Sequence, residues 1–470
     1  MTVASFDIVV IGSGPAGQKA AIQAAKLGKS ALVIEETAHP GGACVHRGTI
    51  PSKTLRETAV ALGLVRARSG GVIDVHPPAD LKLASLMVRL DEVVAAHQRF
   101  IGDQLARNGI ARWHGRAQFT SPDALEVRGV DGTVRTVIGT AIVIATGSRP
   151  RNPPNIPIDH EHVLDSDSIL GISYLPRSLA VIGSGVIASE YACTFAALGV
   201  AVTMIDRAAR PLGFLDEELT TEVVRAFERQ GGSFLGGRTV AAISWDGERV
   251  TTTLDDGREL HTEKLLYCMG REANLAGLGL AAAGLAATTR GLLEVDAQFR
   301  TRIPHIFAVG DVIGPPALAA TAMDQGRRAA CHAFGVETAS TAELVPVGVY
   351  TIPEIATVGL SPAQARERHG DALVGRARFG ELARGQISAI EHGMLMLICD
   401  PQGRLLGVQV VGEGATELVH VGQIAVLAGW TADALVDTVF NFPTLAEAYR
   451  VAALDVCGQR ASRQQDRCAS

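Results

Sequence analysis

Two glycine-rich turns constrain the fold of this 470-residue chain more than any other feature. The first turn, GSGPAG (12–17), follows an apolar strand (8–11) and precedes a helix-like stretch and a second strand (31–34). In such a unit the first glycine makes the turn, the second lets the backbone approach a pyrophosphate, and the third lets helix and strand pack closely. An acid ending the second strand can accept from a ribose hydroxyl. This context predicts a dinucleotide site, with a glycine turn of an unrelated α/β protein as the alternative. The residues predicted to bind are Gly12, Gly14, Gly17 and Glu35.

The same plan recurs about 170 residues later in LAVIGSGVIASEYACTFAALGVAVTMIDR (179–207). Its third glycine slot holds alanine, and its second strand (200–205) ends at an aspartate. A protein that holds two dinucleotides commonly passes hydride between them, and a bound flavin with an exchanging nicotinamide nucleotide is the natural pairing. The residues predicted to bind here are Gly183, Gly185, Ala188, Asp206 and Arg207.

Two further segments indicate which unit binds which nucleotide. IVIATGSRP (142–150) resembles the segment that links the flavin and nicotinamide domains of two-dinucleotide flavoproteins. HIFAVGDV (305–312), followed by a helix-like stretch (318–330), resembles the segment whose aspartate contacts the flavin ribityl chain. These resemblances assign FAD to the first unit and NAD(P) to the second. They add Thr146, Gly147, Asp311 and Ala319 to the predicted cofactor-binding residues.

Composition excludes several other classes of protein. Hydrophobic residues make up 47% and charged residues 20%, as in ordinary globular proteins, and the net charge of −6 has no long like-charge runs. This pattern argues against nucleic acid or an anionic membrane as partner. The N-terminus lacks the basic region of a signal peptide, so we expect a cytoplasmic protein. The seven cysteines form no CxxC pair, which argues against a zinc ribbon or a disulfide scaffold, and no metal site is expected.

With the ordered motifs GGAC…IPSK (41–53), GR (270–271) and PTLAE (443–447), the chain resembles the class I pyridine nucleotide–disulfide oxidoreductases. That family includes dihydrolipoamide dehydrogenase and glutathione reductase. Within it, CVHRGTIPSK (44–53) and DSDSIL (165–170) are most similar to the soluble pyridine nucleotide transhydrogenase branch. The resemblance implies an α/β fold with two Rossmann-type dinucleotide-binding domains and an α+β C-terminal dimerisation domain.

The resemblance also implies a domain plan. The FAD domain would comprise residues 1–155 and 285–345, the NAD(P) domain 156–284, and the dimerisation domain 346–470. In the family, the Pro-Thr-Leu-x-Glu segment completes the active site of the partner subunit. Carried over, Phe442 and Glu447 would face the flavin of the other protomer, and the chain would act as a homodimer or a higher assembly.

The chain departs from the family at two positions. The second redox cysteine of the disulfide reductases is Thr49 here, and the histidine of their acid–base dyad is Phe442, although its glutamate persists as Glu447. A thiolate relay needs both a thiol and a base. The two losses together imply an enzyme without disulfide chemistry; an inactivating drift at Thr49 is the alternative reading.

Hydride transfer remains, because it needs only close approach and alignment of the reacting atoms. The resemblance implies ping-pong transhydrogenation between NADPH or NADH and NAD+ or NADP+ through flavin N5. Lys53 and Glu190 match the family's ion pair beside the flavin, which would stabilise developing charge; a pair that only orients the flavin is the alternative. The residues carried over as catalytic are Lys53, Glu190, Thr49 and Glu447. Those carried over as cofactor-binding are Gly42, Cys44, Lys53, Gly270 and Arg271.

Nucleotide preference is predicted from opposing signals. Asp206 favours the free 2′-hydroxyl of NADH, whereas Arg207 and Arg210 could bind the 2′-phosphate of NADPH. We expect dual use with an NADH bias. The main alternative is an NADH-preferring diaphorase that passes electrons to quinones, dyes or oxygen. A flavin-binding redox sensor with negligible turnover is a third reading.

The remaining predictions concern Cys44, Val186 and the polar C-terminal tail. Cys44 keeps the first redox slot without a partner and is expected to be structural, with a reactive thiol near the flavin as the alternative. Val186 stands where many relatives have a tyrosine that gates the nicotinamide pocket. The polar tail (458–470) is expected to be a frayed end, with an electron shuttle through Cys457 and Cys468 as the alternative.

Overall fold

The first Rossmann unit is built on a six-stranded sheet. In the computed structural model, which describes residues 3–68, 83–339 and 344–469, β1 pairs in parallel with β2 and β5, and β5 pairs in parallel with β16. β3 joins β2, and β4 bridges β3 and β5 in antiparallel fashion. The strands are β1 (Val3–Ile11), β2 (Ala31–Glu35), β3 (Ala111–Phe119), β4 (Ala124–Gly129), β5 (Val134–Ile144) and β16 (Ile306–Ala308).

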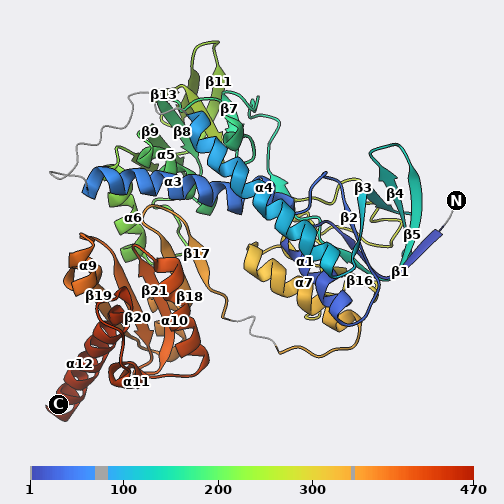
Figure 1. Ribbon diagram of the computed structural model, residues 1–470. Helices are drawn as coiled ribbons and strands as arrows, with labels where there is room; N and C mark the ends of the chain where they lie inside the picture. The colour runs from blue at the N-terminus through green and yellow to red at the C-terminus, as the bar shows by residue number, and fades with distance from the viewer. Residues whose placement is uncertain (1–2, 69–82, 340–343, 470) are drawn as a thin grey trace.

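Helices α1 (Pro15–Lys26) and α7 (Ala319–Ala333) lie side by side against this sheet (Figure 1). They approach so closely that a Cβ added to Gly326 would lie 2.0 Å from the carbonyl oxygen of Ala16. Where β1, β2, β5 and β16 run in parallel, both faces of the sheet are apolar, because parallel strands covered by helices bury both faces. Ile8, Val10 and Val143 are accordingly fully buried.

The second Rossmann unit has a five-stranded parallel sheet in the order β10-β9-β8-β14-β7. α5 (Val186–Ala197) follows β8, and α6 (Glu217–Arg229) begins at an aspartate cap, Asp216. A three-stranded antiparallel sheet of β11, β12 and β13 packs beside it. The strands are β7 (Val163–Asp165), β8 (Ser178–Ile182), β9 (Ala201–Asp206), β10 (Ser233–Gly236), β11 (Val240–Trp245), β12 (Val250–Leu254), β13 (Glu259–Thr262) and β14 (Lys264–Tyr267).

The C-terminal part is an antiparallel sheet in the order β17-β18-β21-β20-β19 with helices against it. Its strands are β17 (Val347–Val349), β18 (Ile355–Gly359), β19 (Leu373–Arg378), β20 (Met394–Cys399) and β21 (Leu405–Val411). Its helices are α8 (Pro362–His369), α9 (Ala383–Ile387), α10 (Ala415–Leu427), α11 (Ala432–Asp437) and α12 (Ala448–Ala469). Two Rossmann-type units and an α+β C-terminal part confirm the predicted fold class.

Connecting elements tie the three parts together. α2 (Gly42–His46), α3 (Thr49–Arg68) and α4 (Leu83–Arg107) follow β2, and α3 extends from the first unit past α5 (Figure 1). Leu55 and Ala59 of α3 belong to one buried cluster with α5 and with Val349 and Ile355 of the C-terminal sheet. Strands β6 (Ser148–Pro150) and β15 (Arg271–Ala273) pair where the chain crosses between the two Rossmann units.

The expectation of a frayed tail is wrong, because α12 continues through Ala469. The segment is polar, but it contains no proline, and its side chains reach the folded body. Arg460 pairs with Asp433, and Arg463 pairs with Asp371. The side chain of Cys468 lies outside the described residues. Within the described ranges, no helix is long and apolar enough to cross a bilayer.

Candidate active site

A cavity of about 1020 Å³ extends from the glycine turn after β1 to the start of α10. It lies where β1, β2, β5 and β16 end, the usual place for ligands on an open parallel sheet. Many of the residues predicted from the sequence line it. They are Gly12, Gly14, Glu35, Gly42, Cys44, Thr49, Lys53, Thr146, Gly147, Val186, Glu190, Arg271, Asp311 and Ala319.

The glycines give the cavity a wall of bare backbone. Gly12 has φ +101°, and a Cβ there would lie 2.4 Å from the carbonyl oxygen of Ala145. A Cβ on Gly17 would lie 1.9 Å from the carbonyl oxygen of Gly12. Gly42 approaches Gly14 so closely that a Cβ on Gly42 would lie 2.7 Å from the Cα atom of Gly14. No side chain caps the N-terminus of α1, so its first N–H groups remain for an anion such as a pyrophosphate.

Glu35 is held rigidly at the end of β2. Its Oε2 accepts from Ser13 N–H at 2.8 Å and from Ser13 Oγ at 2.6 Å. Its Oε1 accepts from Thr37 N–H at 2.9 Å and from Thr37 Oγ1 at 3.0 Å. A carboxylate has about four lone-pair sites. A ribose hydroxyl at Glu35 would therefore take the place of a serine or threonine hydroxyl.

Asp311 is positioned by the crossover strands β6 and β15. Its Oδ2 accepts from Ser148 Oγ at 2.5 Å. Arg271 donates from Nε to Ser148 Oγ at 2.8 Å and from a terminal nitrogen to the Ser148 carbonyl at 2.7 Å. Thr146 and Asn274 add a reciprocal pair of hydrogen bonds, at 2.8 and 3.1 Å. Arg271 thus holds Ser148, and the Ser148 hydroxyl in turn holds the Asp311 carboxylate at the cavity.

An ion pair stands between the two Rossmann units. Lys53 Nζ lies 2.5 Å from Glu190 Oε2, and the side chains are 24% and 9% exposed. The other oxygen, Glu190 Oε1, accepts from Tyr350 N–H at 2.9 Å. The ammonium also lies 4.9 Å from the centroid of the Tyr350 ring, within cation–π range. The structure brings Lys53 and Glu190 together, as predicted from their positions in the sequence.

Cys44 and Thr49 lie beside this pair. Burial raises the pKa of the Cys44 thiol, although a hydrogen bond with the Thr49 side chain and the charge of Lys53 act in the opposite direction. Cys44 is free, as are the other five cysteines whose side chains are described. A neutral, half-buried thiol is a poor nucleophile. The Thr49 hydroxyl occupies the place from which a second thiol would have to act.

The second nucleotide turn is open to a ligand at its tip. Gly183 has φ +112°, and a Cβ there would lie 2.8 Å from the Cys268 carbonyl oxygen. A Cβ on Gly185, the N-cap of α5, would meet nothing within 4 Å. Ala188 is buried in α5, where it packs, and Gly270 has φ +109° in the turn after β14. None of these four lines the large cavity.

The charged side chains at and after the end of β9 differ in whether they have partners within the chain. Asp206 Oδ1 accepts from Ala208 N–H at 2.8 Å. Arg207 is exposed and makes no side-chain hydrogen bond or ion pair within the described part of the chain. Arg210 donates to the carbonyls of Leu215 and Gly213 and to Thr220 Oγ1. Arg210 is therefore occupied in its own loop, and Arg207 is the arginine available to a 2′-phosphate.

Glu447 and Phe442 lie outside the cavity of their own chain. Glu447 Oε2 accepts from Thr444 N–H at 3.3 Å and caps the short 3₁₀ helix at Leu445–Glu447. Phe442 is 69% exposed. An exposed phenylalanine and a capping glutamate do not form an acid–base pair within one chain. Their predicted role at the partner's cavity stays a prediction.

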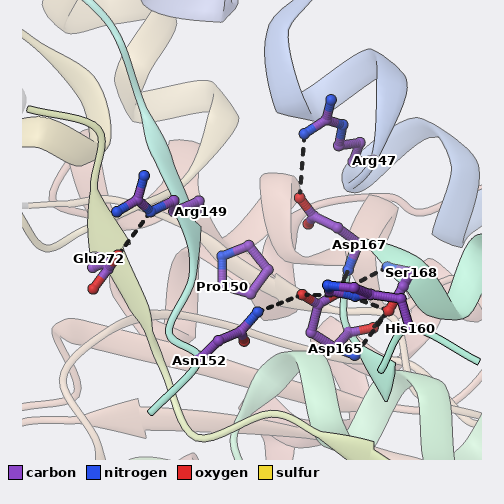
Figure 2. Close-up of a pocket in the computed structure, with 9 residues that line it drawn as sticks. All are labelled: Arg47, Arg149, Pro150, Asn152, His160, Asp165, Asp167, Ser168 and Glu272. Carbon is purple, nitrogen blue, oxygen red and sulfur yellow. Dashed lines mark hydrogen bonds and ion pairs between the residues drawn. The ribbon is translucent and has the colours of Figure 1, made fainter. Parts of the chain in front are cut away.

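A smaller pocket of about 530 Å³ adjoins the cavity and shares Arg47, Arg149 and Asp167 with it (Figure 2). Asp165 lines this pocket and organises the turn that follows it. Its Oδ1 accepts from the N–H groups of Asp167 and Ser168, and its Oδ2 accepts from Asn152. Although burial opposes it, hydrogen bonds from Asn152 and Ser168 lower the pKa of Asp165.

This turn places Asp167 between two arginines. Its Oδ2 lies 3.8 Å from Arg47, and its Oδ1 lies 3.6 Å from Arg271. Burial raises the pKa of Asp167, with the two guanidinium groups acting in the opposite direction. The motif DSDSIL (165–170) thus links Arg47, at the end of α2, to Arg271 of strand β15.

Comparison with known proteins identifies the family. The family model described as pyridine nucleotide-disulphide oxidoreductase matches residues 6–326, and its dimerisation domain matches residues 345–453. The chain belongs to the pyridine nucleotide-disulphide oxidoreductase family. It is an oxidoreductase by that membership, and the predicted resemblance is confirmed.

Individual members of the family match over nearly the whole chain. A soluble pyridine nucleotide transhydrogenase of Mycobacterium bovis is 43% identical over 98% of this chain and 99% of its own length. That of Hahella chejuensis is 39% identical over 96% and 98%. Among solved structures, LpdA of Mycobacterium tuberculosis has a TM-score of 0.89 at 28% identity, covering 96% of this chain and 99% of its own. The flavoprotein disulfide reductase RclA of Escherichia coli, as its Cu(II) complex, has a TM-score of 0.87 at 27% identity over 97% and 99%.

Several residues that shape the site are not predictable from the sequence. Tyr350, Ser148 and Asn274 each hold a predicted residue in place, and Arg47 meets Asp167 at the mouth. Tyr350 lies 160 residues from Glu190 in the sequence, and no local pattern announces such a contact. Tyr350 lies in the predicted dimerisation domain (346–470), and nothing in the sequence around it indicates a contact with the Rossmann units.

Proposed function

We propose that this chain is an FAD-dependent NAD(P)+ transhydrogenase that works by ping-pong exchange and has no redox-active disulfide. The observation that carries the proposal is Thr49 beside a solitary Cys44, in a cavity whose Lys53–Glu190 pair is intact. Two nucleotide-binding turns and relatives named soluble pyridine nucleotide transhydrogenase support it.

The residues fit a flavin dinucleotide in the large cavity. The bare backbone at Gly12, Gly14 and Gly42 and the uncapped start of α1 suit its pyrophosphate, and Asp311 suits a polyol hydroxyl. Bound FAD would supply an acceptor for hydride from one nicotinamide nucleotide and a donor of hydride to the next. Lys53 would hold a fixed positive charge where negative charge develops.

The nicotinamide nucleotide would bind along the start of α5. Gly185 leaves room for its phosphates, and Val186 and Ile187 line the cavity between that helix and Lys53. With no bulky side chain at position 186, donor and acceptor can use one site in turn, as ping-pong exchange requires. We further infer a homodimer, which the match to the family's dimerisation domain supports.

An NADH-preferring diaphorase is the second candidate. It is favoured by Asp206 at the end of β9 together with the engagement of Arg210 in its own loop. An acid at this position accepts from a free 2′-hydroxyl and repels a 2′-phosphate. Only Arg207 would then offset the repulsion of NADPH.

Purified, FAD-loaded protein mixed with NADPH and thio-NAD+ separates the two candidates. We expect reduction of thio-NAD+, followed at the absorbance of the reduced thio-nucleotide, and no turnover with lipoamide or glutathione disulfide. If NADPH fails to reduce the flavin while NADH bleaches it quickly, the transhydrogenase proposal is overturned in favour of the diaphorase. Turnover of either disulfide would contradict the absence of a disulfide relay.

A further inference from the structure

Each carboxylate oxygen of Glu190 has its own partner, Lys53 or Tyr350, and these two partners also contact each other. Oε2 binds the Lys53 ammonium at 2.5 Å, and Oε1 accepts the Tyr350 N–H at 2.9 Å. The ammonium lies 4.9 Å from the centroid of the Tyr350 ring. The Tyr350 backbone therefore orients the carboxylate, while its ring gives the ammonium a second contact. A long, flexible lysine held from two sides loses most of its freedom to swing.

Tyr350 is itself clamped by the helix that carries Lys53. Arg56, three residues after Lys53 on α3, donates from Nε to the Thr351 carbonyl at 3.1 Å. Its terminal nitrogen lies 3.2 Å from Glu354 Oε1, and the Arg56 side chain is only 7% exposed. Glu354 Oε2 in turn accepts from Thr416 N–H and Oγ1 at 3.1 and 2.8 Å. Residues 350–354 are thus fixed between α3 and the start of α10.

We propose that Tyr350, which belongs to the C-terminal domain and not to either nucleotide unit, is the residue that positions the Lys53 ammonium in the cavity. The inference rests on the proposed function only in taking the cavity to hold a flavin. Tyr350, Lys53 and Glu190 all line that cavity. A cation fixed there stabilises negative charge that enters the cavity with a hydride, whereas a mobile cation spends part of its time elsewhere.

The ring, not the hydroxyl, is the part of Tyr350 that acts on Lys53. An aromatic face attracts a cation through its quadrupole, and phenylalanine offers the same face. Within the described residues, the Tyr350 hydroxyl makes no hydrogen bond to Lys53 or Glu190. Replacement by phenylalanine should preserve the positioning, and replacement by leucine should remove it while leaving the backbone N–H to Glu190 in place.

The test is the equilibrium of flavin reduction in the FAD-loaded full chain, measured against a reference dye with xanthine and xanthine oxidase. This readout uses no nicotinamide nucleotide. We expect Tyr350→Phe to stay within twofold of the unaltered protein. We expect Tyr350→Leu to weaken reduction by threefold to tenfold, and tenfold is about 30 mV for a two-electron couple. Tyr174→Leu is the matched control, because Tyr174 also faces a lysine, Lys264 at 4.7 Å, but does not line the cavity.

A graded series guards against a leucine variant that does not fold. Mono-, di- and trifluorophenylalanine at position 350 keep the volume of the ring but weaken its negative face step by step. The reduction equilibrium should fall in the same order. A flat series, or a leucine variant equal to the unaltered protein, overturns the proposal. A phenylalanine variant as impaired as leucine also overturns it, because the hydroxyl would then be responsible.

Failure of the proposed function is distinguishable from failure of this inference. A flavin-loaded chain without transhydrogenation, but with the graded response, would overturn the proposed function and leave Tyr350 in its role. Transhydrogenation with a flat fluorine series would do the reverse. A chain that retains no flavin would overturn both, and is recognised from the absorption spectrum before any variant is made.

Discussion

Lys53 Nζ lies 2.5 Å from Glu190 Oε2, although 137 residues separate the two in the sequence. The pair joins α3 of the first Rossmann unit to α5 of the second. Because each side chain comes from a different nucleotide unit, the pair forms only when both units are folded and docked. Under the proposed function, the pair would lie where the flavin and the nicotinamide meet.

The first prediction concerns this pair. Lys53→Met should slow reduction of the flavin by NADH on the order of 100-fold, because a preorganised charge is removed from the reacting centre. Glu190→Gln should slow it less, by roughly tenfold, since the ammonium remains but loses its ion-pair partner. Stopped-flow absorbance of the flavin measures both. Lys26→Met, an exposed lysine at the end of α1, is the control, and a Lys53→Met rate within twofold of the unaltered protein would exclude a catalytic role.

A second prediction distinguishes the effects of Asp206, Arg207 and Arg210 on nucleotide preference. Asp206→Ala should raise kcat/KM for NADPH by roughly tenfold and lower it for NADH, because a ribose 2′-hydroxyl acceptor and a repulsive charge are both removed. Arg207→Ala should lower kcat/KM for NADPH by about tenfold and leave NADH within twofold. Arg210→Ala should change the ratio little and lower the melting temperature instead, since its guanidinium binds Leu215, Gly213 and Thr220. Steady-state kinetics with both nucleotides decide this, and a ratio governed by Arg210 would contradict it.

The third prediction concerns the cysteine slot. Cys44→Ser should keep transhydrogenation within about twofold, because a thiol kept neutral by burial takes no part in hydride transfer. Since the pKa of Cys44 is raised above its usual value of 9.0, its alkylation by iodoacetamide should be slow at pH 7 and pH 8 and should accelerate only above pH 9. Mass spectrometry of the labelled peptide measures the rate. Rapid labelling at pH 7 would show a thiolate and reopen a redox role.

Thr49→Cys extends that test. It restores two cysteines at the family's spacing, so two thiols should become titratable only after reduction. Lipoamide turnover should stay undetectable, because Phe442 cannot serve as the base that returns a proton. Thr49→Ser is the matched control, since it keeps the hydroxyl and adds no thiol.

The sequence was sufficient for the architecture because the two nucleotide units are encoded locally. Each glycine turn makes a close approach that only glycine allows, as at Gly12 and Gly17, and each lies between an apolar strand and a helix. The tail was misjudged because polar composition does not by itself end a helix. Arg460 and Arg463 anchor α12 through Asp433 and Asp371, which are distant in the sequence.

Site residues could be predicted only where the residue type and its place in a motif indicate a chemical role. Lys53, Glu190 and Asp311 could be named, but the residues that orient them could not. Tyr350 and Ser148 act through contacts made by docking of separate parts. Glu35 was expected to accept from a ribose hydroxyl, but its four hydrogen bonds from the backbone and side chains of Ser13 and Thr37 could not be foreseen. Contacts of this kind depend on tertiary structure and leave no periodic trace in the chain.

The fourth prediction uses the lowered pKa of Asp165. A carboxylate whose pKa is lower in the folded state than in the unfolded state, where it is about 3.9, stabilises the fold above that value. The stabilisation is lost as the pH falls through the folded-state pKa. Asp165→Asn should therefore lower the melting temperature by roughly 3–6 °C at pH 7, and the difference should shrink toward pH 3. Asp103→Asn, at an exposed carboxylate with no ion pair or side-chain hydrogen bond within the described residues, is the control in the same scanning fluorimetry. A difference that does not depend on pH would show that the negative charge of Asp165 is not what stabilises the turn.

The last prediction concerns assembly. The C-terminal domain exposes large apolar side chains: Ile424 is 63% exposed, Val439 93% and Phe442 69%. Exposed apolar side chains that gather in one patch mark an interaction site. With the match to the dimerisation domain, we expect Ile424→Glu to convert a dimer to monomers in sedimentation velocity. Lys26→Glu on the first unit should leave the dimer intact.

If Phe442 and Glu447 complete the partner's cavity, the monomeric variant should also lose transhydrogenation while keeping its own FAD. A monomer that is fully active would instead place the whole reaction within one chain.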